Sequence, residues 1–377
     1  MFVKSKRNKR ILIIIAVIIF AVLLLWLIIP LIYSGNVGSF NIYASTYNAE
    51  ISADSVDDTQ LTDNKLVKIG DKLYYNYQAN IFSYGTYEIS SNGAKRIYWG
   101  AGPIVQDNDK VLEPIAVYDG MLVSDSISYD FSNIYINVYN ASSCGFNNSI
   151  SFDRSAITYS DVRLEYIDNK NYFITSTHVY QETGGQVTDI ANVYDKGEDI
   201  IADYKILNLQ GDIVYYAKGV DDECVIASYN IDTNTKKKLC TFSVECERIN
   251  SIFSDGKNLI VEVGWGYTDA NSSESYLRLY YVDTEKNGTP QEIYKNDGSE
   301  AYGGCLMYNG VLYYNIAEAD GGIYAVGLDD ITQREKIYSG YVASIHILDS
   351  EWIYFTDESN ALSRITHDGD IVERIFG

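Results

Sequence analysis

The residue types most often used in catalysis do not form a recognised motif in this 377-residue chain. Its three histidines, His178, His346 and His367, stand far from one another in the sequence. The chain contains no Gly-x-Ser-x-Gly turn, no His-x-x-x-His pair, no phosphate-binding glycine loop and no EF-hand loop. The sequence therefore predicts no catalytic residues and no cofactor, and it predicts the histidines at surface or strand-turn positions.

Acidic residues gather in three short segments, Asp107-Asn108-Asp109, Asp221-Asp222-Glu223 and Asp329-Asp330. Oxygen-rich loops of this kind can bind calcium. None of the three has the alternating ligand spacing of a dedicated site, so we expect solvated turns and predict no metal site.

Carboxylates that face each other across a cavity can also hydrolyse glycosidic bonds. The chain has 51 acidic residues, so candidate pairs arise by chance. The segment Ser254-Asp255-Gly256-Lys257 does not match the Ser-x-Asp-x-Gly-x-x-Trp box that sialidases repeat. A hydrolase or lyase that acts on envelope polysaccharide is therefore kept as the alternative hypothesis.

Three aromatic residues are the candidate binding residues, because glycines flank them. Trp99 lies in Tyr-Trp-Gly-Ala-Gly, and Trp265 and Tyr267 lie in Gly-Trp-Gly-Tyr. Neighbouring glycines leave an aromatic ring exposed, and such rings stack on sugars or on a partner protein. The alternative is that each tryptophan folds back over the edge of a sheet.

Composition and charge narrow the class of protein. Hydrophobic residues make up 46% of the chain, and 35 residues are tyrosine, which favours β-structure. The first ten residues contain five cations and no anion, so the remainder carries 24 cations against 51 anions. Nucleic-acid binding requires a basic surface. We therefore exclude nucleic-acid partners.

The five cysteines do not resemble a disulfide framework or a zinc site. They are Cys144, Cys224, Cys240, Cys246 and Cys305, an odd number with no Cys-x-x-Cys pair. We expect buried thiols. A bridge between Cys240 and Cys246 across a hairpin stays open as an alternative.

The amino-terminal part of the chain predicts a membrane anchor. Residues 11–29 are all apolar, and a helix of that length spans about 28 Å, close to the thickness of a bilayer core. No small-x-small cleavage site follows, and the basic residues precede the apolar run. We predict a cytoplasmic tail at 1–10, a single-pass transmembrane signal anchor at 11–33, and an extracytoplasmic remainder.

A flexible linker is expected at 34–60, where Ser, Asn, Asp, Gly and Ala dominate. The run Phe40–Tyr43 could add one strand to the domain that follows. That domain is predicted at 61–377.

Turn residues followed by apolar runs recur through the domain. The predicted turns are at Gly70, Gly120, Asn169, Gly211, Gly256, Gly310 and Ser350, between 40 and 54 residues apart. This is the period of four-stranded propeller blades. The sequence predicts an all-β protein, a closed β-propeller of about seven four-stranded blades. Six or eight blades also fit the period.

The last repeat, Ile345–Gly377, shows the pattern most clearly. Four β-branched and aromatic runs are separated by Asp-Ser, Asp-Glu-Ser-Asn and His-Asp-Gly. Its Ile353-Tyr354-Phe355-Thr356-Asp357 segment, followed by Leu362-Ser363-Arg364 and Asp368-Gly369, resembles the Tyr-Trp-Thr-Asp repeat of low-density-lipoprotein-receptor propellers. The whole chain resembles bacterial membrane-anchored relatives of that family, which often have no known function. The resemblance implies a binding or scaffolding role and supplies no catalytic residues.

The resulting expectation is a membrane-tethered module outside the cytoplasm that binds a protein or a cell-envelope polymer and is not an enzyme.

Overall fold

The computed structural model describes residues 65–77, 84–98, 105–107, 110–123, 126–140, 145–153, 163–167, 170–183, 186–194, 204–220, 223–244, 248–264, 277–286, 288–296 and 302–377. The regular elements in these ranges are β-strands, β1 to β28. The prediction of an all-β protein is confirmed. The predicted anchor and linker, residues 1–60, and the strand proposed at Phe40–Tyr43 lie outside the described residues.

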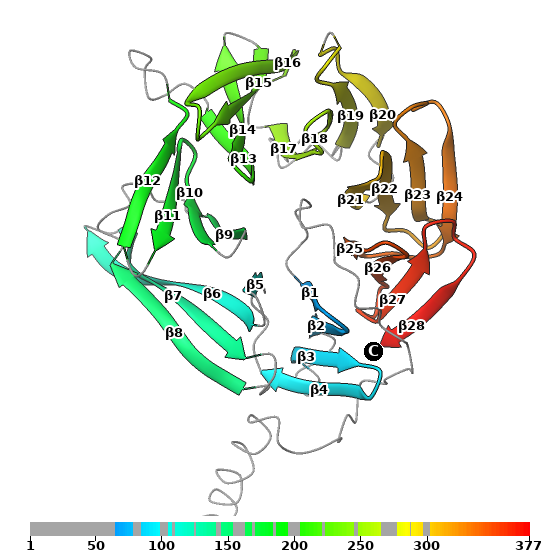
Figure 1. Cartoon of the computed structure of the whole chain (residues 1–377), viewed down its shortest axis with the longest axis horizontal. Helices are drawn as coiled ribbons and strands as arrows, with labels where there is room; N and C mark the ends of the chain where they lie inside the picture. Colours follow the sequence, from blue (N-terminus) through cyan, green and yellow to red (C-terminus); the bar gives the residue numbers. More distant parts are fainter. Residues whose placement is uncertain are drawn as a thin grey trace, which may run out of the picture.

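The strands form seven antiparallel sheets, and each sheet consists of four strands that are consecutive in the chain. We call these sheets blades 1 to 7. Figure 1 shows them arranged around a central axis, with the first strand of each blade nearest the centre, as in a β-propeller.

The strands of each blade are as follows. Blade 1 has β1 (Leu66–Ile69), β2 (Lys72–Tyr77), β3 (Gly85–Ser90) and β4 (Gly93–Tyr98). Blade 2 has β5 (Val105–Asp107), β6 (Lys110–Val123), β7 (Ser126–Asn140) and β8 (Gly145–Asp153). Blade 3 has β9 (Arg163–Ile167), β10 (Lys170–Ile174), β11 (His178–Thr183) and β12 (Gln186–Asn192). Blade 4 has β13 (Tyr204–Gln210), β14 (Ile213–Val220), β15 (Glu223–Asn230) and β16 (Thr235–Phe242).

Blade 5 has β17 (Ile249–Ser254), β18 (Asn258–Gly264), β19 (Leu277–Asp283) and β20 (Gln291–Lys295). Blade 6 has β21 (Tyr302–Tyr308), β22 (Val311–Ile316), β23 (Gly322–Gly327) and β24 (Arg334–Ser339). Blade 7 has β25 (Ser344–Leu348), β26 (Trp352–Thr356), β27 (Leu362–Thr366) and β28 (Val372–Phe376).

Five of the turns predicted between first and second strands occur at described residues. Four of these positions are glycines in the left-handed backbone region, with φ of 57° at Gly70, 54° at Gly211, 92° at Gly256 and 74° at Gly310. Only glycine adopts this conformation without steric cost, which is why it marks these turns. Ser350 lies between β25 and β26. Asn169, itself outside the described residues, stands between β9 and β10 in the sequence.

The turn predicted at Gly120 is wrong. Gly120 lies inside β6, opposite Tyr129 of β7, and the register shifts between Val117 and Asp119. A glycine within a strand often accompanies such an irregularity instead of ending the strand. The first turn of blade 2 instead lies between Asp107 and Lys110, which pair with each other.

The core lies between the faces of adjacent blades. One cluster joins Leu209 and Tyr216 of blade 4 to Tyr172 and Val179 of blade 3. Another joins Tyr314 and Cys305 of blade 6 to blade 5. Because second strands are covered on both faces, their apolar residues do not alternate strictly with polar ones.

Blade 1 packs against blade 7, which Figure 1 shows beside it. Phe376 of β28 is fully buried and its ring centroid lies 5.1 Å from that of Tyr77 and 4.7 Å from that of Tyr87. The Tyr75 hydroxyl donates to the Asn360 carbonyl oxygen at 2.9 Å. Among the described strands, none from blade 1 joins the sheet of blade 7. Side-chain contacts therefore hold this boundary, which we call the seam.

Each blade has two ends along the ring axis. First strands begin, and second strands finish, on one face of the ring, which we call the entry face because β1 begins there. The turns after the first strands lie on the other face. Within the described ranges, no helix is long and apolar enough to cross a membrane.

Candidate functional site

A buried polar network in the described part of the chain centres on Asp349, in the turn between β25 and β26. Asp349 Oδ1 accepts hydrogen bonds from the backbone N–H of Glu351 at 3.0 Å and of Trp352 at 2.8 Å. This is the local bonding by which aspartate stabilises a turn. These local hydrogen bonds therefore help to fix the orientation of the carboxylate within its own turn.

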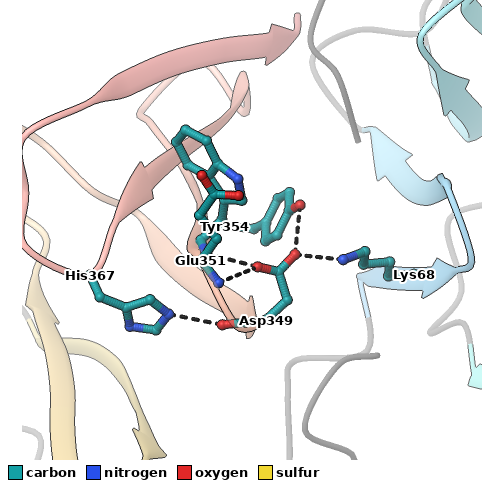
Figure 2. Close-up of polar contacts among 6 residues, drawn as sticks. Lys68, Asp349, Glu351, Tyr354 and His367 are labelled. Carbon is teal, nitrogen blue, oxygen red and sulfur yellow. Dashed lines mark hydrogen bonds and ion pairs between the residues drawn. The ribbon is translucent and has the colours of Figure 1, made fainter. Parts of the chain in front are cut away.

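The second carboxylate oxygen of Asp349 binds a residue of another blade. Asp349 Oδ2 accepts from Lys68 Nζ at 2.5 Å and from the Tyr354 hydroxyl at 3.0 Å, as Figure 2 shows. The side chains of Lys68 and Asp349 are 1% and 0% exposed. Lys68 is on β1 and precedes Asp349 by 281 residues, so this ion pair spans the seam.

The electrostatics of the pair follow from its burial. Burial alone would raise the pKa of Asp349, but the hydrogen bond from Lys68, the turn N–H groups and the positive charge of Lys68 together lower that pKa below its usual value. Burial and the negative charge of Asp349 raise the pKa of Tyr354. Asp349 is therefore held as a carboxylate, with Tyr354 as a neutral donor.

His367 extends the network to blade 6. Its Nε2 lies 2.8 Å from the Asp349 carbonyl oxygen, which only accepts, so Nε2 carries the hydrogen (Figure 2). In the neutral ring, Nδ1 then accepts from the Tyr313 hydroxyl at 2.9 Å. Burial, followed by the charge of Tyr308, raises the pKa of Tyr313 to about 12. Polar contacts thus run from blade 6 through blade 7 to blade 1.

This network is suited to holding blades together. A catalytic group must be reached by its substrate, whereas Lys68 and Asp349 are almost fully enclosed. When two buried charges pair with each other and form further hydrogen bonds, they favour one arrangement of the strands that carry them. Their net contribution to stability is smaller, because both charges lose their hydration. We therefore assign the network to the seam.

A second polar cluster lies toward the entry face, around Glu262 of β18. Burial raises the pKa of Glu262, while its hydrogen bond to the Ser251 hydroxyl and the charge of Lys205 oppose that rise. Lys205 Nζ donates to the Ile249 carbonyl oxygen at 2.6 Å, which links blades 4 and 5. Burial, followed by the charge of Glu262, raises the pKa of the Cys305 thiol in blade 6. The hydrogen bond from Lys205 thus links blades 4 and 5, and the charge of Glu262 acts on a residue of blade 6.

The other two histidines have local partners. His178 begins β11, with Nδ1 2.8 Å from the Thr177 hydroxyl and Nε2 3.7 Å from Asp189 Oδ2. The second distance is longer than a hydrogen bond. His346 is fully buried within β25, not at the surface, and its Nε2 lies 3.1 Å from the Thr356 hydroxyl. The structure does not bring the three histidines together.

The binding candidates Trp99, Trp265 and Tyr267 lie outside the described residues. Trp265 and Tyr267 directly follow the end of β18, and Trp99 lies in the connection from β4 to the start of β5. Second strands finish and first strands begin on the entry face. The described strands β4 and β18, which precede them in the sequence, both end on that face.

The remaining predicted features fall in turns or in buried positions. Asp330 accepts hydrogen bonds from Thr332 N and Gln333 Nε2 within the turn after β23. Within the described ranges, no three His, Cys, Asp or Glu residues are arranged to hold a metal ion. Cys224, Cys240 and Cys305 are buried and form no disulfide, so Cys240 is not bridged. Cys246 lies outside the described residues.

Comparisons with known proteins give fold-level similarity. No protein-family model matches the chain, and no curated protein gives a significant match. The designed Ika8 protein is 12% identical with a TM-score of 0.45, over 80% of this chain and 82% of Ika8. The β-propeller domain of Cps50 (Swd1) from Myceliophteria thermophila is 8% identical with a TM-score of 0.46, over 84% of this chain and 97% of that domain.

A prolyl endopeptidase matches at 12% identity with a TM-score of 0.48, over 87% of this chain and 50% of the endopeptidase. This chain thus spans about half the length of that enzyme. A nidogen/laminin complex chain is 14% identical with a TM-score of 0.36, over 65% of this chain and 90% of that one. At these identities and scores, the matches assign neither a family nor an activity.

Proposed function

We propose that this chain is a membrane-tethered, extracytoplasmic β-propeller that binds a protein or a cell-envelope polymer and does not catalyse a reaction. The ring is closed by the contact of blade 7 with blade 1. Residues 1–10 are the cytoplasmic tail, 11–33 the anchor, 34–60 the linker and 61–377 the propeller. The chain belongs, on this proposal, with bacterial relatives of the Tyr-Trp-Thr-Asp propellers.

One observation carries the binding role. Strands β4 of blade 1 and β18 of blade 5 both end on the entry face, and in the sequence Trp99 directly follows β4 while Trp265 and Tyr267 follow β18. A propeller supplies a rigid frame, and aromatic residues on its connections supply contact area for sugars or protein. Binding residues contributed by several blades to one face are what a recognition surface requires.

The binding role is tested by co-sedimentation of the full-length protein, in detergent, with insoluble cell-wall polysaccharide purified from the source cells. We expect Trp99→Ala with Trp265→Ala to reduce the bound fraction at least tenfold. Val220→Ala is the matched control, because Val220 is an apolar residue that is 42% exposed at the end of β14, on the same face. Equal binding by the double variant, or release of new reducing ends from the polysaccharide, would contradict the proposal.

The topology is tested separately. Protease added to intact cells should degrade residues 65–377, and protection of that region would overturn the extracytoplasmic assignment.

A further inference from the structure

Glu262 is the only ionisable residue of β18, and it lies at a level of the ring where other blades bury neutral side chains. This level is six residues after the first residue of the turn between first and second strands. In blades 1, 3, 4, 6 and 7 the residue at this place is at most 2% exposed, and these residues are Asn76, Ile174, Ala217, Asn315 and Thr356. Among these six blades, only blade 5 places an acidic residue there.

The sheet of blade 5 offers the Glu262 side chain little solvation. Its cross-strand partner on β19 is Leu279, which is fully buried. Arg278 and Tyr280, on either side of Leu279, lie on the opposite face of the sheet, because successive residues of a strand alternate. On β17 the Ser251 hydroxyl donates a hydrogen bond to the Glu262 carboxylate. The partly buried carboxylate thus has one neutral donor in its own sheet, where water would supply several.

The two neighbouring blades add ionisable groups. From blade 4, Lys205 acts on Glu262 by its positive charge, and its Nζ donates to the Ile249 carbonyl oxygen of blade 5 at 2.6 Å. From blade 6, the Tyr302 hydroxyl and the Cys305 thiol of β21 lie within electrostatic reach of Glu262. Both groups are neutral, because burial raises the pKa of each. Strand β17 contributes no ionisable group. Glu262 therefore lies where three blades meet.

This arrangement favours the protonated form of Glu262. A carboxylate that leaves water must recover its hydration from nearby donors and cations. Burial raises the pKa of Glu262, and the Ser251 hydrogen bond and the charge of Lys205 oppose that rise without cancelling it. The protonated side chain carries no charge, like the neutral residues that other blades bury at the same level. The folded protein thus binds this proton more tightly than the unfolded chain does.

We infer that Glu262 is a pH-sensitive joint between blades 4, 5 and 6, which is more stable in a mildly acidic medium than in a neutral one. Its stabilising effect is complete below about 4.3, the ordinary pKa of an unfolded glutamate, and is lost as the pH rises through the higher value in the fold. The seam has the opposite sign, because Asp349 loses its contribution at acid pH. The inference stands apart from the proposed function, since it concerns the frame and not a ligand.

Thermal unfolding of the full-length protein in detergent, between pH 5 and pH 8, tests the joint. Glu262→Gln keeps the size of the side chain and removes its charge. Its melting temperature should therefore rise relative to wild type as the pH increases, by about 2 °C or more over this range. Glu292→Gln is the matched control, because Glu292 lies on β20 of the same blade and its side chain is 41% exposed. Its difference from wild type should stay constant.

Ser251→Ala keeps the test decisive if replacement of Glu262 prevents folding. Without the Ser251 hydroxyl the carboxylate is less well solvated, so this variant should lose more thermal stability than wild type between pH 5 and pH 8. A difference between Glu262→Gln and wild type that does not depend on pH would overturn the inference. A change of the opposite sign, or a Ser251→Ala variant with the pH dependence of wild type, would also overturn it.

Discussion

Asp349 shows how one residue serves both its own turn and a distant blade. Its Oδ1 organises the turn between β25 and β26, and its Oδ2 receives Lys68 of β1 at 2.5 Å. The Lys68 side chain is only 1% exposed, so bulk solvent does not reach its ammonium group. The pair therefore makes the fit of blade 7 to blade 1 dependent on two specific side chains.

Asp349→Asn tests this dependence. The amide keeps the shape but leaves the Lys68 charge buried without a carboxylate, and breaking a buried pair in this way costs about 3 to 5 kcal/mol. The free energy of unfolding, measured by urea denaturation, should fall by that amount at pH 7. Lys286→Ala removes an ion pair whose lysine is 82% exposed and should leave stability unchanged within error.

The pH dependence has a defined sign. The pKa of Asp349 is lowered in the folded protein, so its contribution is complete above the unfolded value of about 3.9 and is lost as the pH falls through the lower folded value. The stability difference between wild type and Asp349→Asn should therefore shrink below about pH 4. A difference that stays constant to pH 3 would contradict this assignment, as would a Lys68→Met, Asp349→Leu double variant no more stable than Asp349→Asn.

At the scale of single residues, the sequence predicts the turn that contains Asp349 but not the ion pair that Asp349 forms with Lys68. Asp349-Ser350 was predicted as a turn from residue types alone. The partner Lys68 lies 281 residues away and belongs to no motif, because a pairing between the first and last blades depends on ring geometry. His346 is similar: its burial follows from the contact between blades, which no local pattern records. Trp99, Trp265 and Tyr267 stay predictions.

At the scale of elements, turn chemistry was the most reliable signal. Gly70, Gly211, Gly256 and Gly310 have positive φ and occupy turns where the sequence predicts them. Gly120 has the same residue type but lies in β6, because the hairpin of blade 2 continues beyond its sheet. Glycine spacing alone cannot distinguish a turn from a strand irregularity. The longer hairpin was thus missed by the same reasoning that found the other blades.

Two glycines of β23 allow a matched test of backbone packing. A Cβ on Gly322, where φ is 145°, would lie 1.9 Å from the Tyr338 carbonyl oxygen on β24. A Cβ on Gly327 would have no atom within 4 Å. We expect Gly322→Ala to destabilise the protein by at least about 2 kcal/mol, through backbone strain and overpacking. Gly327→Ala should change stability by less than about 0.5 kcal/mol.

Thermal and urea unfolding of the two alanine variants provide the measurement. Equal stability of both variants would show that β23 and β24 separate without cost at their ends.

At the scale of the whole molecule, the 40- to 54-residue period correctly predicted repeated four-stranded sheets, and the described residues form seven of them. The length of the repeat does not show which side chains join blade 7 to blade 1. That information is in side chains such as Phe376, which lies among Tyr75, Tyr77 and Tyr87 of blade 1. In the sequence, apolar residues of a terminal blade have the same pattern whether or not they pack against the first blade.

Removal of blade 7 tests whether the ring folds as one unit. A chain that ends at Val342 lacks all four strands of blade 7 and uncovers the facing sides of blades 6 and 1. Ile353, Phe355, Leu362 and Ile375 are each at most 1% exposed, and burial of each side chain stabilises by about 1.5 to 3 kcal/mol. Typical domains are stable by only about 5 to 15 kcal/mol in total.

We therefore expect the shortened chain to lose its cooperative thermal transition and its near-ultraviolet circular dichroism. An open stack of sheets would tolerate the loss of a terminal repeat. Cooperative melting of the shortened protein near the temperature of the full chain would show that the closed ring is wrong.

The seam joins residues that are synthesised far apart in time. The face of blade 1 formed by Tyr75, Tyr77 and Tyr87 is made early, but the Phe376 ring that covers it is made almost 300 residues later. At about 5 to 20 residues per second, a ribosome needs roughly 15 to 60 s to cover that distance. The tyrosine-rich face of blade 1 therefore stays uncovered until blade 7 has been synthesised. During the interval before this contact forms, the uncovered tyrosine-rich face exposes the nascent chain to aggregation and to proteases.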